Sequence, residues 1–323
     1  MKIFKLPEAA FFFRGNKMVQ ILAALGLVFT AAIWGFSFVV VKDSLNDISA
    51  VYMIAIRFAI AALSVGIVFF KRLKKINAQY LKKAGLIGVF LFLAYFAQTV
   101  GCKYTTPGRN AFLTTFYVVL IPFCSWIAYK KRPAWTVFAA VLLQVAGIGF
   151  LSLGGKSESG AGFNFGDFLT LVCAVFFCLQ IFFQSYFSKE SEENDPVVYA
   201  FVQFAVGAVL AWCVAPFYDA EKNMVTAVFQ PLSSVDFGSR GFIMSALYLG
   251  IACTAVAFVL QNIGLKYLSP SLSTILLSFE SVFGMLFSVL IPVNGVREKL
   301  SVYGVVGCAL IFAAVIIAQR QES

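Results

Sequence analysis

The chain has 323 residues and a formal net charge of +10, with 61% hydrophobic and only 12% charged residues. A soluble globule of this size carries about twice that share of charged residues on its surface. The composition therefore excludes a soluble protein and predicts an integral membrane protein with many spans. The chain has no His, which excludes His-containing catalytic triads, His-ligated metals and His proton relays.

Ten apolar segments follow one another along the chain, and each is close to the roughly 20 residues that one membrane-spanning helix needs. The first is too long for the apolar region of a cleavable signal peptide, so we expect it to remain as a helix. Most connections are short, which makes consecutive helices antiparallel neighbours. The predicted spans are 19–41, 50–70, 84–104, 108–128, 134–153, 164–186, 197–217, 241–267, 271–292 and 301–318.

The basic residues predict the orientation of these spans. When Lys103, Arg109 and Lys266 at the ends of spans are counted with the adjacent loops, the two terminal segments, 1–18 and 319–323, and the even-numbered loops hold sixteen Lys and Arg residues, against eight in the odd-numbered loops. In the first half of the chain the ratio is thirteen to four. Cytoplasmic loops carry such an excess, so we expect both termini in the cytoplasm and the protein in the cell's inner (plasma) membrane. This reading attributes the basic charge to loops near membrane lipids and predicts no nucleic-acid partner.

The seven cysteines suggest neither a disulfide framework nor a metal site. They lie within or at the ends of apolar segments, and no C-x-x-C pair occurs. Cysteines of this kind behave as small apolar packing residues. The stretch Gly154–Ser157 resembles the end of a phosphate-binding loop, but Phe150 stands where the motif requires its first glycine. We therefore expect no metal, no cofactor and no nucleotide hydrolysis.

An internal repeat is the strongest signal in the sequence. Residues 98–107 read QTVGCKYTTP and residues 261–270 read QNIGLKYLSP, five identities at a constant offset of 163 residues. The offset is almost half the chain, and each copy lies at the end of the third span of its half. The two repeats are then 19–153 and 164–318. Because five spans per half is an odd number, the halves must cross the membrane in opposite directions, an architecture found in many secondary transporters.

These residues also carry a resemblance to a known family. The stretch AAIWGFSFVVVK in the first span, the pair Arg57 and Phe58 in the second, and KYTTPGRNAFLTTFYVVLIPFCSWI across the third and fourth resemble EamA-type members of the drug/metabolite transporter superfamily. The resemblance extends over about 19–318. It implies a ten-helix inner-membrane carrier that exports small metabolites, with a central cavity lined mainly by spans one, three, four, six, eight and nine.

Two ionisable side chains lie deep inside predicted spans, where a charge costs about 2.5–3.5 kcal/mol at the centre of a helix on insertion scales. Arg57 lies in the second span, and we expect a structural role for it, tied to backbone carbonyls or a helix end. Glu280 lies at about the midplane of the ninth span. Its simplest role is a neutral, hydrogen-bonded packing residue. The functional alternative is a coupling site that exchanges a proton with either side, or with a cationic group of the substrate.

Polar and aromatic residues within the spans complete the candidate site. Tyr117 aligns with Glu280 at the 163-residue offset, so the repeat predicts that they form two walls of one cavity. Interhelical hydrogen bonding is the commoner role of such polar residues. The candidate substrate-binding residues are Trp34, Ser37, Tyr95, Gln98, Asn110, Tyr117, Gln180, Gln261, Phe279 and Glu280.

Pro107 and Pro270 end the two copies of the repeated motif, each in a very short turn between two spans. Proline suits a sharp reversal because its φ is fixed and its nitrogen carries no hydrogen. The inverted repeat places one turn on each side of the membrane, so each is a hinge candidate for its own gate.

The sequence as a whole predicts a secondary active transporter rather than an enzyme, with a small-molecule substrate and alternating access around a polar and aromatic cavity. A nucleotide-sugar or triose-phosphate exchanger is the main alternative, but it needs several basic residues in the cavity for phosphate. A membrane-bound lipid or prenyl enzyme would need clustered Asp or His near one interface. A sensor would need an extramembrane signalling domain.

Overall fold

A computed structural model describes residues 17–130, 132, 135–154, 156–157, 160–161, 163–190, 194–218, 235–268, 270–293, 295–298 and 301–319. Most of the two predicted terminal segments (1–16 and 320–323) and most of the longest predicted connection (219–234) lie outside the described residues.

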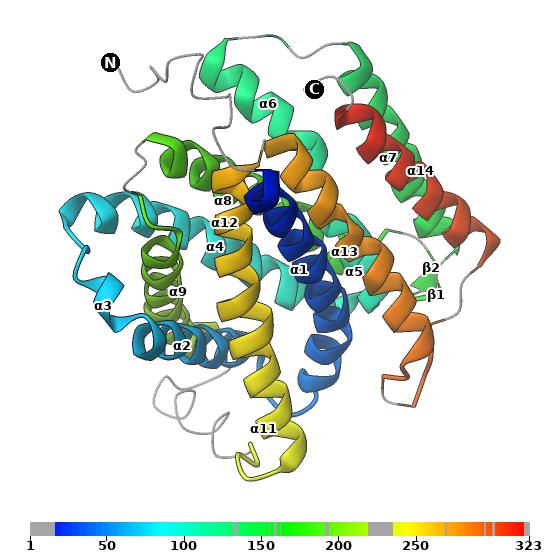
Figure 1. The fold of residues 1–323 in the computed structure, drawn as a ribbon. Coiled ribbons are helices and arrows are strands. Elements are labelled where there is room, and N and C mark those ends of the chain that lie inside the picture. The colour runs from blue at the N-terminus through cyan, green and yellow to red at the C-terminus, as the bar shows by residue number, and fades with distance from the viewer. Residues whose placement is uncertain are drawn as a thin grey trace.

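The described chain is built from helices apart from a hairpin of two short strands, β1 (Lys156–Ser157) and β2 (Gly160–Ala161). Figure 1 shows the helices as one bundle, with α1 beginning and α14 ending at the same end of it. The helices are α1 (Lys17–Ser44), α2 (Ala50–Val68), α3 (Phe70–Leu73), α4 (Ala78–Tyr104), α5 (Pro107–Thr114), α6 (Tyr117–Tyr129), α7 (Trp135–Gly154), α8 (Phe165–Glu190), α9 (Pro196–Tyr218), α11 (Arg240–Leu247), the π-helix η2 (Tyr248–Val256), α12 (Ala257–Tyr267), α13 (Pro270–Leu290) and α14 (Val302–Gln319).

Each predicted span has its helix or helical series. Among the described residues, eight stretches are long and apolar enough to cross a membrane, and the fourth and eighth spans are the composites α5–α6 and α11–η2–α12. The fifth and tenth spans, α7 and α14, contain shorter apolar helices, Phe138–Phe150 and Val302–Ala314. The protein is therefore an all-α, multi-pass membrane protein with ten spans.

The helix contacts have the two-fold pattern expected from two inverted five-helix repeats. Helix α4 packs on α8, and its counterpart α12 packs on α1. Helix α1 packs on α13 in the same way that α8 packs on α5 and α6. The pairs α2–α9, α5–α13 and α7–α14 each join a helix to its own counterpart, as elements on a two-fold axis must do. The interior of the bundle is thus an interface between the two halves.

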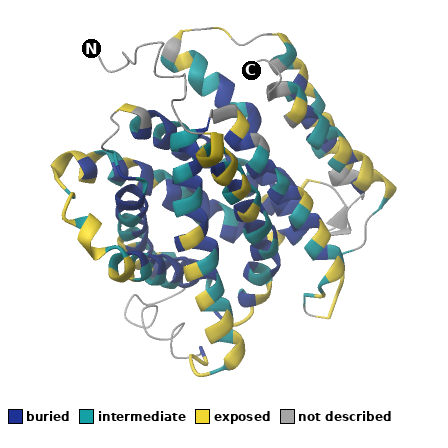
Figure 2. Cartoon of the chain, in the orientation of Figure 1, coloured by how far each residue is buried: buried dark blue, intermediate teal, exposed yellow. Residues whose placement is uncertain are grey.

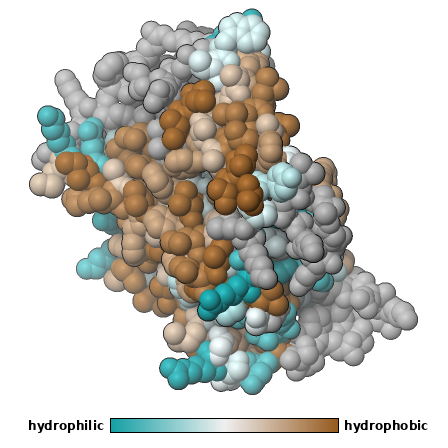
Figure 3. Space-filling model, turned by 90° about the vertical axis from the view of Figure 1, so that its right-hand side faces the viewer, coloured by the Kyte–Doolittle hydropathy of each residue, from teal (hydrophilic) through white to brown (hydrophobic). Residues whose placement is uncertain are grey.

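The outer surface is apolar, as lipid contact requires. Figure 2 shows buried residues on the inward sides of the helices and exposed residues on their outward sides. Figure 3 shows brown, apolar side chains over the middle of one face, with hydrophilic ones toward its margins. Large hydrophobic side chains such as Ile67, Leu142 and Val209 are exposed. A soluble monomer does not expose apolar patches of this extent.

The fourth span is broken rather than continuous, and this differs from the single helix expected for 108–128. Residues Thr115 and Phe116 separate α5 from α6, and Phe116 N donates to Leu113 O while Val118 N donates to Thr115 O, the tighter i to i−3 pattern. Pro122 follows one turn later and cannot donate to the carbonyl of Val118. The eighth span widens instead, since nine of its residues form the π-helix η2. Irregular turns of both kinds are frequent at functional sites.

Glycines allow the helices of the two halves to approach closely. A Cβ atom added at Gly35 of α1 would meet the Cβ of Phe283 and would lie 2.8 Å from the backbone nitrogen of Gly284 in α13. A Cβ added at Gly284 of α13 would lie 2.5 Å from that of Ala111 in α5. Small residues at such crossings bring backbones into contact, and dispersion forces then hold helices together within lipid.

We expect Gly35→Ala to destabilise the α1–α13 contact by about 1–3 kcal/mol, because the methyl group overpacks the crossing. Thermal unfolding of the detergent-solubilised protein should show a lowered melting temperature. Gly149→Ala on α7 is the matched control, since nothing lies within 4 Å of the added methyl group and alanine favours the helix. Equal melting temperatures for the two variants would contradict this account of the crossing.

Candidate functional site

A cavity lies between the two halves at the level of the break between α5 and α6. Side chains from α1, α4, α5, α6, α8, α12 and α13 line it, so it draws on spans one, three, four, six, eight and nine, as the resemblance implies. The free volume of the cavity is about 20 Å³, enough for roughly one water molecule. The lining residues are Trp34, Ser37, Phe38, Tyr95, Gln98, Thr114, Tyr117, Phe177, Ile181, Gln261 and Glu280.

Seven of the ten candidate residues from the sequence line this cavity. The repeat aligns four of them in two pairs, since Gln98 is equivalent to Gln261 and Tyr117 is equivalent to Glu280. The seven are Trp34, Ser37, Tyr95, Gln98, Tyr117, Gln261 and Glu280. Sequence reasoning did not select Phe38 and Phe177 for the lining, because 37 Phe residues in one chain leave no signal that distinguishes a cavity-lining ring from a packing ring.

The other three candidates lie between helices, outside the lining. Asn110 Nδ2 donates to Thr170 Oγ1 at 3.1 Å and to the carbonyl of Gln98 at 3.2 Å. Gln180 Nε2 donates to Gln203 Oε1 at 3.2 Å and thereby joins α8 to α9. Phe279 packs edge-on against Phe312 of α14, with 5.7 Å between ring centroids. The two amide side chains thus form interhelical hydrogen bonds, the commoner role of polar residues within spans. Phe279 packs against a neighbouring helix.

Glu280 projects into the cavity from α13 with only 3% of its surface exposed, and its Oε1 accepts no hydrogen bond. The Tyr117 hydroxyl faces the Glu280 carboxyl group and interacts with it, although the geometry falls short of a normal hydrogen bond. Gln261 Oε1 is the third buried polar atom of this cavity without a partner. Groups of this kind normally have partners, so three orphaned oxygens around one small space indicate a binding site.

Arg57 does not pair with Glu280. Its Nε donates to Thr254 Oγ1 at 3.1 Å and its Nη2 donates to Cys253 Sγ at 3.1 Å, which ties α2 to the π-helix η2. Its guanidinium lies over the ring of Tyr95, 4.2 Å from the centroid. The side chain is 2% exposed, and its partners are side chains rather than the backbone carbonyls or helix end that the sequence led us to expect.

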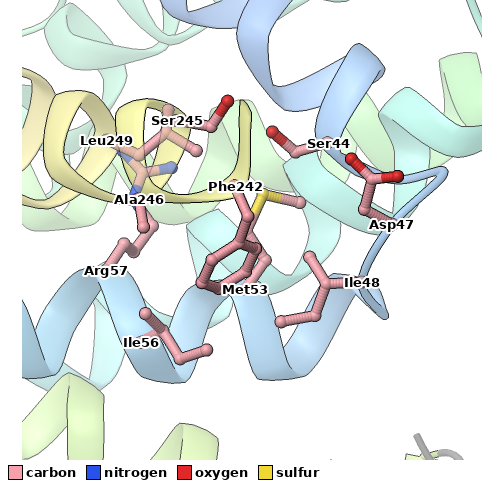
Figure 4. A pocket seen from close by; sticks show the side chains of 10 residues that line it. All are labelled: Ser44, Asp47, Ile48, Met53, Ile56, Arg57, Phe242, Ser245, Ala246 and Leu249. Atoms are coloured by element: carbon pink, nitrogen blue, oxygen red, sulfur yellow. The ribbon is translucent and has the colours of Figure 1, made fainter. Parts of the chain in front are cut away.

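A second, more apolar pocket lies on the other side of Arg57, between the α1–α2 connection, α2 and α11–η2. Figure 4 shows Phe242 and Met53 at its centre, with Ser44 and Asp47 toward one end and Arg57 toward the other. Its lining residues are Ser44, Asp47, Ile48, Met53, Ile56, Arg57, Phe242, Ser245, Ala246 and Leu249. The Tyr95 ring that Arg57 covers lines the central cavity, so these two side chains lie between the spaces.

Polar contacts hold the turn between α4 and α5, and sequence reasoning missed most of them. Asp167 of α8 forms a buried ion pair with Arg109 of α5, with 0% and 4% of the side chains exposed, and also accepts from Thr105 Oγ1 at 2.8 Å. Asp167 therefore does not reach solvent. Glu298 accepts from Thr106 Oγ1 at 2.6 Å and from Gly108 N at 3.1 Å. At the α4–α5 end of the bundle, these contacts join α5 to α8 and to the α13–α14 connection.

The two hinge candidates begin helices. Pro107 is the first residue of α5, and the preceding Thr106 caps that helix by accepting from Arg109 N at 3.3 Å. Proline suits this position because the first helical N–H has no partner in the helix. Pro270 is the first residue of α13. The two proline turns are thus equivalent in backbone placement as well as in sequence.

Comparison with known proteins gives consistent matches over the whole bundle. The sequence profile of the EamA-like transporter family matches residues 21–153 and again residues 164–319. An uncharacterized transporter of Archaeoglobus fulgidus is 36% identical over 298 residues, which cover 92% of this chain and 86% of that protein. The uncharacterized transporter YoaV of Bacillus subtilis is 21% identical and covers 91% and 94% of the two chains.

One solved crystal structure has the same fold. It shares 20% sequence identity, superposes with a TM-score of 0.63, and covers 94% of this chain and 99% of its own.

We expect Asp167→Asn to lower stability by about 3–5 kcal/mol, because it leaves the buried guanidinium of Arg109 without its counter-charge. Thermal unfolding in detergent should show a large fall in melting temperature. Glu190→Gln is the control, since Glu190 pairs with Lys83 but is 41% exposed, and such pairs contribute about 0–1 kcal/mol. A loss for Asp167→Asn no greater than that of the control would show that the buried pair is not a structural tie.

Proposed function

Because the chain belongs to the EamA-like transporter family, we propose that it is a secondary active transporter that exports small amphipathic metabolites, such as amino acids, across the inner membrane. The observation that carries this proposal is the cavity between the two inverted halves, with three unpaired polar oxygens and five aromatic side chains in its walls. Substrate sites of inverted-repeat transporters lie near the midplane where the halves meet. The small volume corresponds to a closed conformation around that site.

Alternating access would proceed by opening one end of the bundle while the other stays shut. The α4–α5 end is held by the Arg109–Asp167 pair and by Glu298, so this end opens only when those contacts separate. The prolines at 107 and 270 are the hinge candidates for the two ends. The broken fourth span and the π-helix of the eighth place irregular backbone beside the cavity, where a small rotation changes its shape.

Glu280 is the candidate for coupling to an ion gradient. Burial favours the neutral form of a carboxyl group, and a counter-cation favours the charged form. A conformational change that alters its surroundings can therefore make Glu280 take up a proton at one side and release it at the other. Tyr95, Tyr117 and Cys173 are the titratable side chains within electrostatic reach, and Arg57 lies beyond the Tyr95 ring.

The lining of the cavity favours this function over the alternatives. The described lining residues include no Lys or Arg, whereas a phosphate-carrying substrate needs several such donors. They include a single carboxyl group, whereas acid–base chemistry on lipids generally uses a cluster. A carrier of uncharged or amine-bearing metabolites fits the site better than a phosphate exchanger or an enzyme does.

Metabolite export provides the direct test. Cells that express the chain should accumulate at least one small metabolite outside that control cells do not, and the export should depend on external pH. Glu280→Gln should keep the protein folded, because the amide is close in shape, but should abolish the pH dependence. Glu280→Ala should also weaken substrate binding. Asp236→Asn, which changes an exposed carboxylate in a turn, is the control and should behave as the unchanged chain.

No difference in exported metabolites between expressing and control cells would contradict the transporter proposal. Normal export by Glu280→Gln with an unchanged pH profile would remove Glu280 as the coupling group.

Topology in the membrane gives a separate test. The positive-inside rule places the loop that contains Lys75 in the cytoplasm and the α1–α2 connection outside. A membrane-impermeant maleimide added to intact cells should label an Asp43→Cys variant but not a Lys75→Cys variant, both of which replace exposed residues. Permeabilised cells should show labelling of both, and the unsubstituted chain sets the background from its own cysteines. The reverse pattern would overturn the orientation.

A further inference from the structure

We propose that the central cavity binds the head group of an organic ammonium ion, with the apolar part of the ligand against the aromatic wall. This inference rests on the proposed function and names the substrate class of the same site. Its starting point is that the orphaned polar atoms of the cavity are all oxygens.

The unpaired atoms can all accept hydrogen bonds. They are Glu280 Oε1, Tyr117 Oη and Gln261 Oε1, in side chains that are 3%, 2% and 1% exposed. They come from α13, α6 and α12 and line one cavity. Three acceptors around one point match the three N–H donors of a primary ammonium group. Buried oxygens left unpaired destabilise the protein, so a ligand with donors gains by satisfying them.

Several donors of the cavity are already in use. Trp34 Nε1 donates to the carbonyl of Cys253 at 2.9 Å, and Ser37 Oγ donates to the carbonyl of Trp34 at 2.7 Å. Gln98 Nε2 donates to Thr114 Oγ1 at 3.2 Å, and Thr114 in turn donates to the carbonyl of Asn110 at 2.8 Å. The Cys253 carbonyl that accepts the hydrogen bond from Trp34 belongs to the π-helix η2. A carboxylate or phosphate in this cavity would find few donors beyond the Tyr117 hydroxyl and the Gln261 amide, and it would lie close to the Glu280 carboxyl group.

The aromatic lining adds to the preference for a cation. Trp34, Phe38, Tyr95 and Phe177 line the same space, and the rings of Tyr95 and Phe177 pack edge-on at 5.5 Å. Aromatic rings attract ammonium groups through the negative faces of their π-systems, and several rings together recognise organic cations in other proteins. Arg57 lies over the Tyr95 ring and is not among the residues that line the cavity.

Charge and size agree with this ligand. Glu280 is the one carboxyl group among the described lining residues, and the cation holds it as a carboxylate, so that any proton it carried leaves for solvent. A divalent metal ion such as calcium would need six to eight oxygen ligands, which is more than this lining offers. The space of about 20 Å³ suits a head group close to the size of water. The rest of the ligand enters when the cavity widens.

Equilibrium binding to the purified full chain in lipid nanodiscs tests the proposal with three probes of one shape. They are 2-phenylethylammonium, the neutral 2-phenylethanol and the anion phenylacetate, each titrated calorimetrically at neutral pH. We expect the cation to bind at least about tenfold more tightly than the alcohol, equal to about 1.4 kcal/mol, and phenylacetate to bind more weakly still. Glu280→Gln should lose at least about tenfold in affinity for the cation, and Asp236→Asn should lose nothing.

A second variant guards against misfolding of the first. Tyr117→Phe keeps the ring and removes one orphaned oxygen, so it should weaken binding of the cation by a few-fold while leaving that of the alcohol unchanged. Size-exclusion elution at the position of the unchanged chain verifies that each variant is folded.

Several outcomes would overturn the ammonium site: equal affinities for the cation and the alcohol, tighter binding of phenylacetate, absence of binding by all three probes, or full affinity in both variants. Binding of the cation without any metabolite export would contradict the proposed transport function but would support the ammonium site. Export without binding of the cation would remove this site and leave the transporter.

Discussion

A bilayer offers no water to a polar group, so each one must find its partner inside the protein or carry the cost. This constraint explains why Arg109 and Asp167 pair with 4% and 0% of their side chains exposed, and why Arg57 is held by Thr254, Cys253 and the ring of Tyr95. It also makes the exceptions informative. The unpaired oxygens of Glu280, Tyr117 and Gln261 lie around one cavity, where a transported molecule can supply what the protein leaves out.

The two halves share their architecture but differ in the ion pairs at their ends. The position that corresponds to Arg109 at the 163-residue offset is Leu272, which is 40% exposed, so the second half has no equivalent of this ion pair at that position. The opposite end of the bundle has ion pairs with exposed partners, since Arg72 and Lys75 are 53% and 59% exposed where they meet Asp195. Exposed pairs contribute little because water screens them. The duplicated fold thus joins its helices at the two ends with ion pairs of unequal strength.

Residue patterns predicted the cavity better than they predicted the packing around it. Glu280 was identified because hydropathy locates the ends of a span and counting from them gives depth in the membrane. Tyr117 and Gln261 followed from the offset, since equivalent positions in an inverted repeat meet near the same axis. Asn110, Gln180 and Phe279 have suitable depth but face neighbouring helices. The sequence gives the depth of a residue in the membrane, whereas the direction in which its side chain points depends on the rotation of its helix. The spans are mostly apolar and have little amphipathic pattern to set that rotation.

The sequence by itself determined the membrane class, the ten spans, the duplication and the presence of a lone carboxyl group at mid-depth, because each depends only on composition or on spacing along the chain. Only the tertiary structure decided that Arg57 meets Tyr95 rather than Glu280, that Asp167 pairs with Arg109, and that the fourth span breaks beside the cavity. The two contacts join residues that lie about 40 and 60 positions apart, and the break depends on how a helix adapts to its neighbours. Close packing of the complete bundle sets both, and no local pattern encodes them.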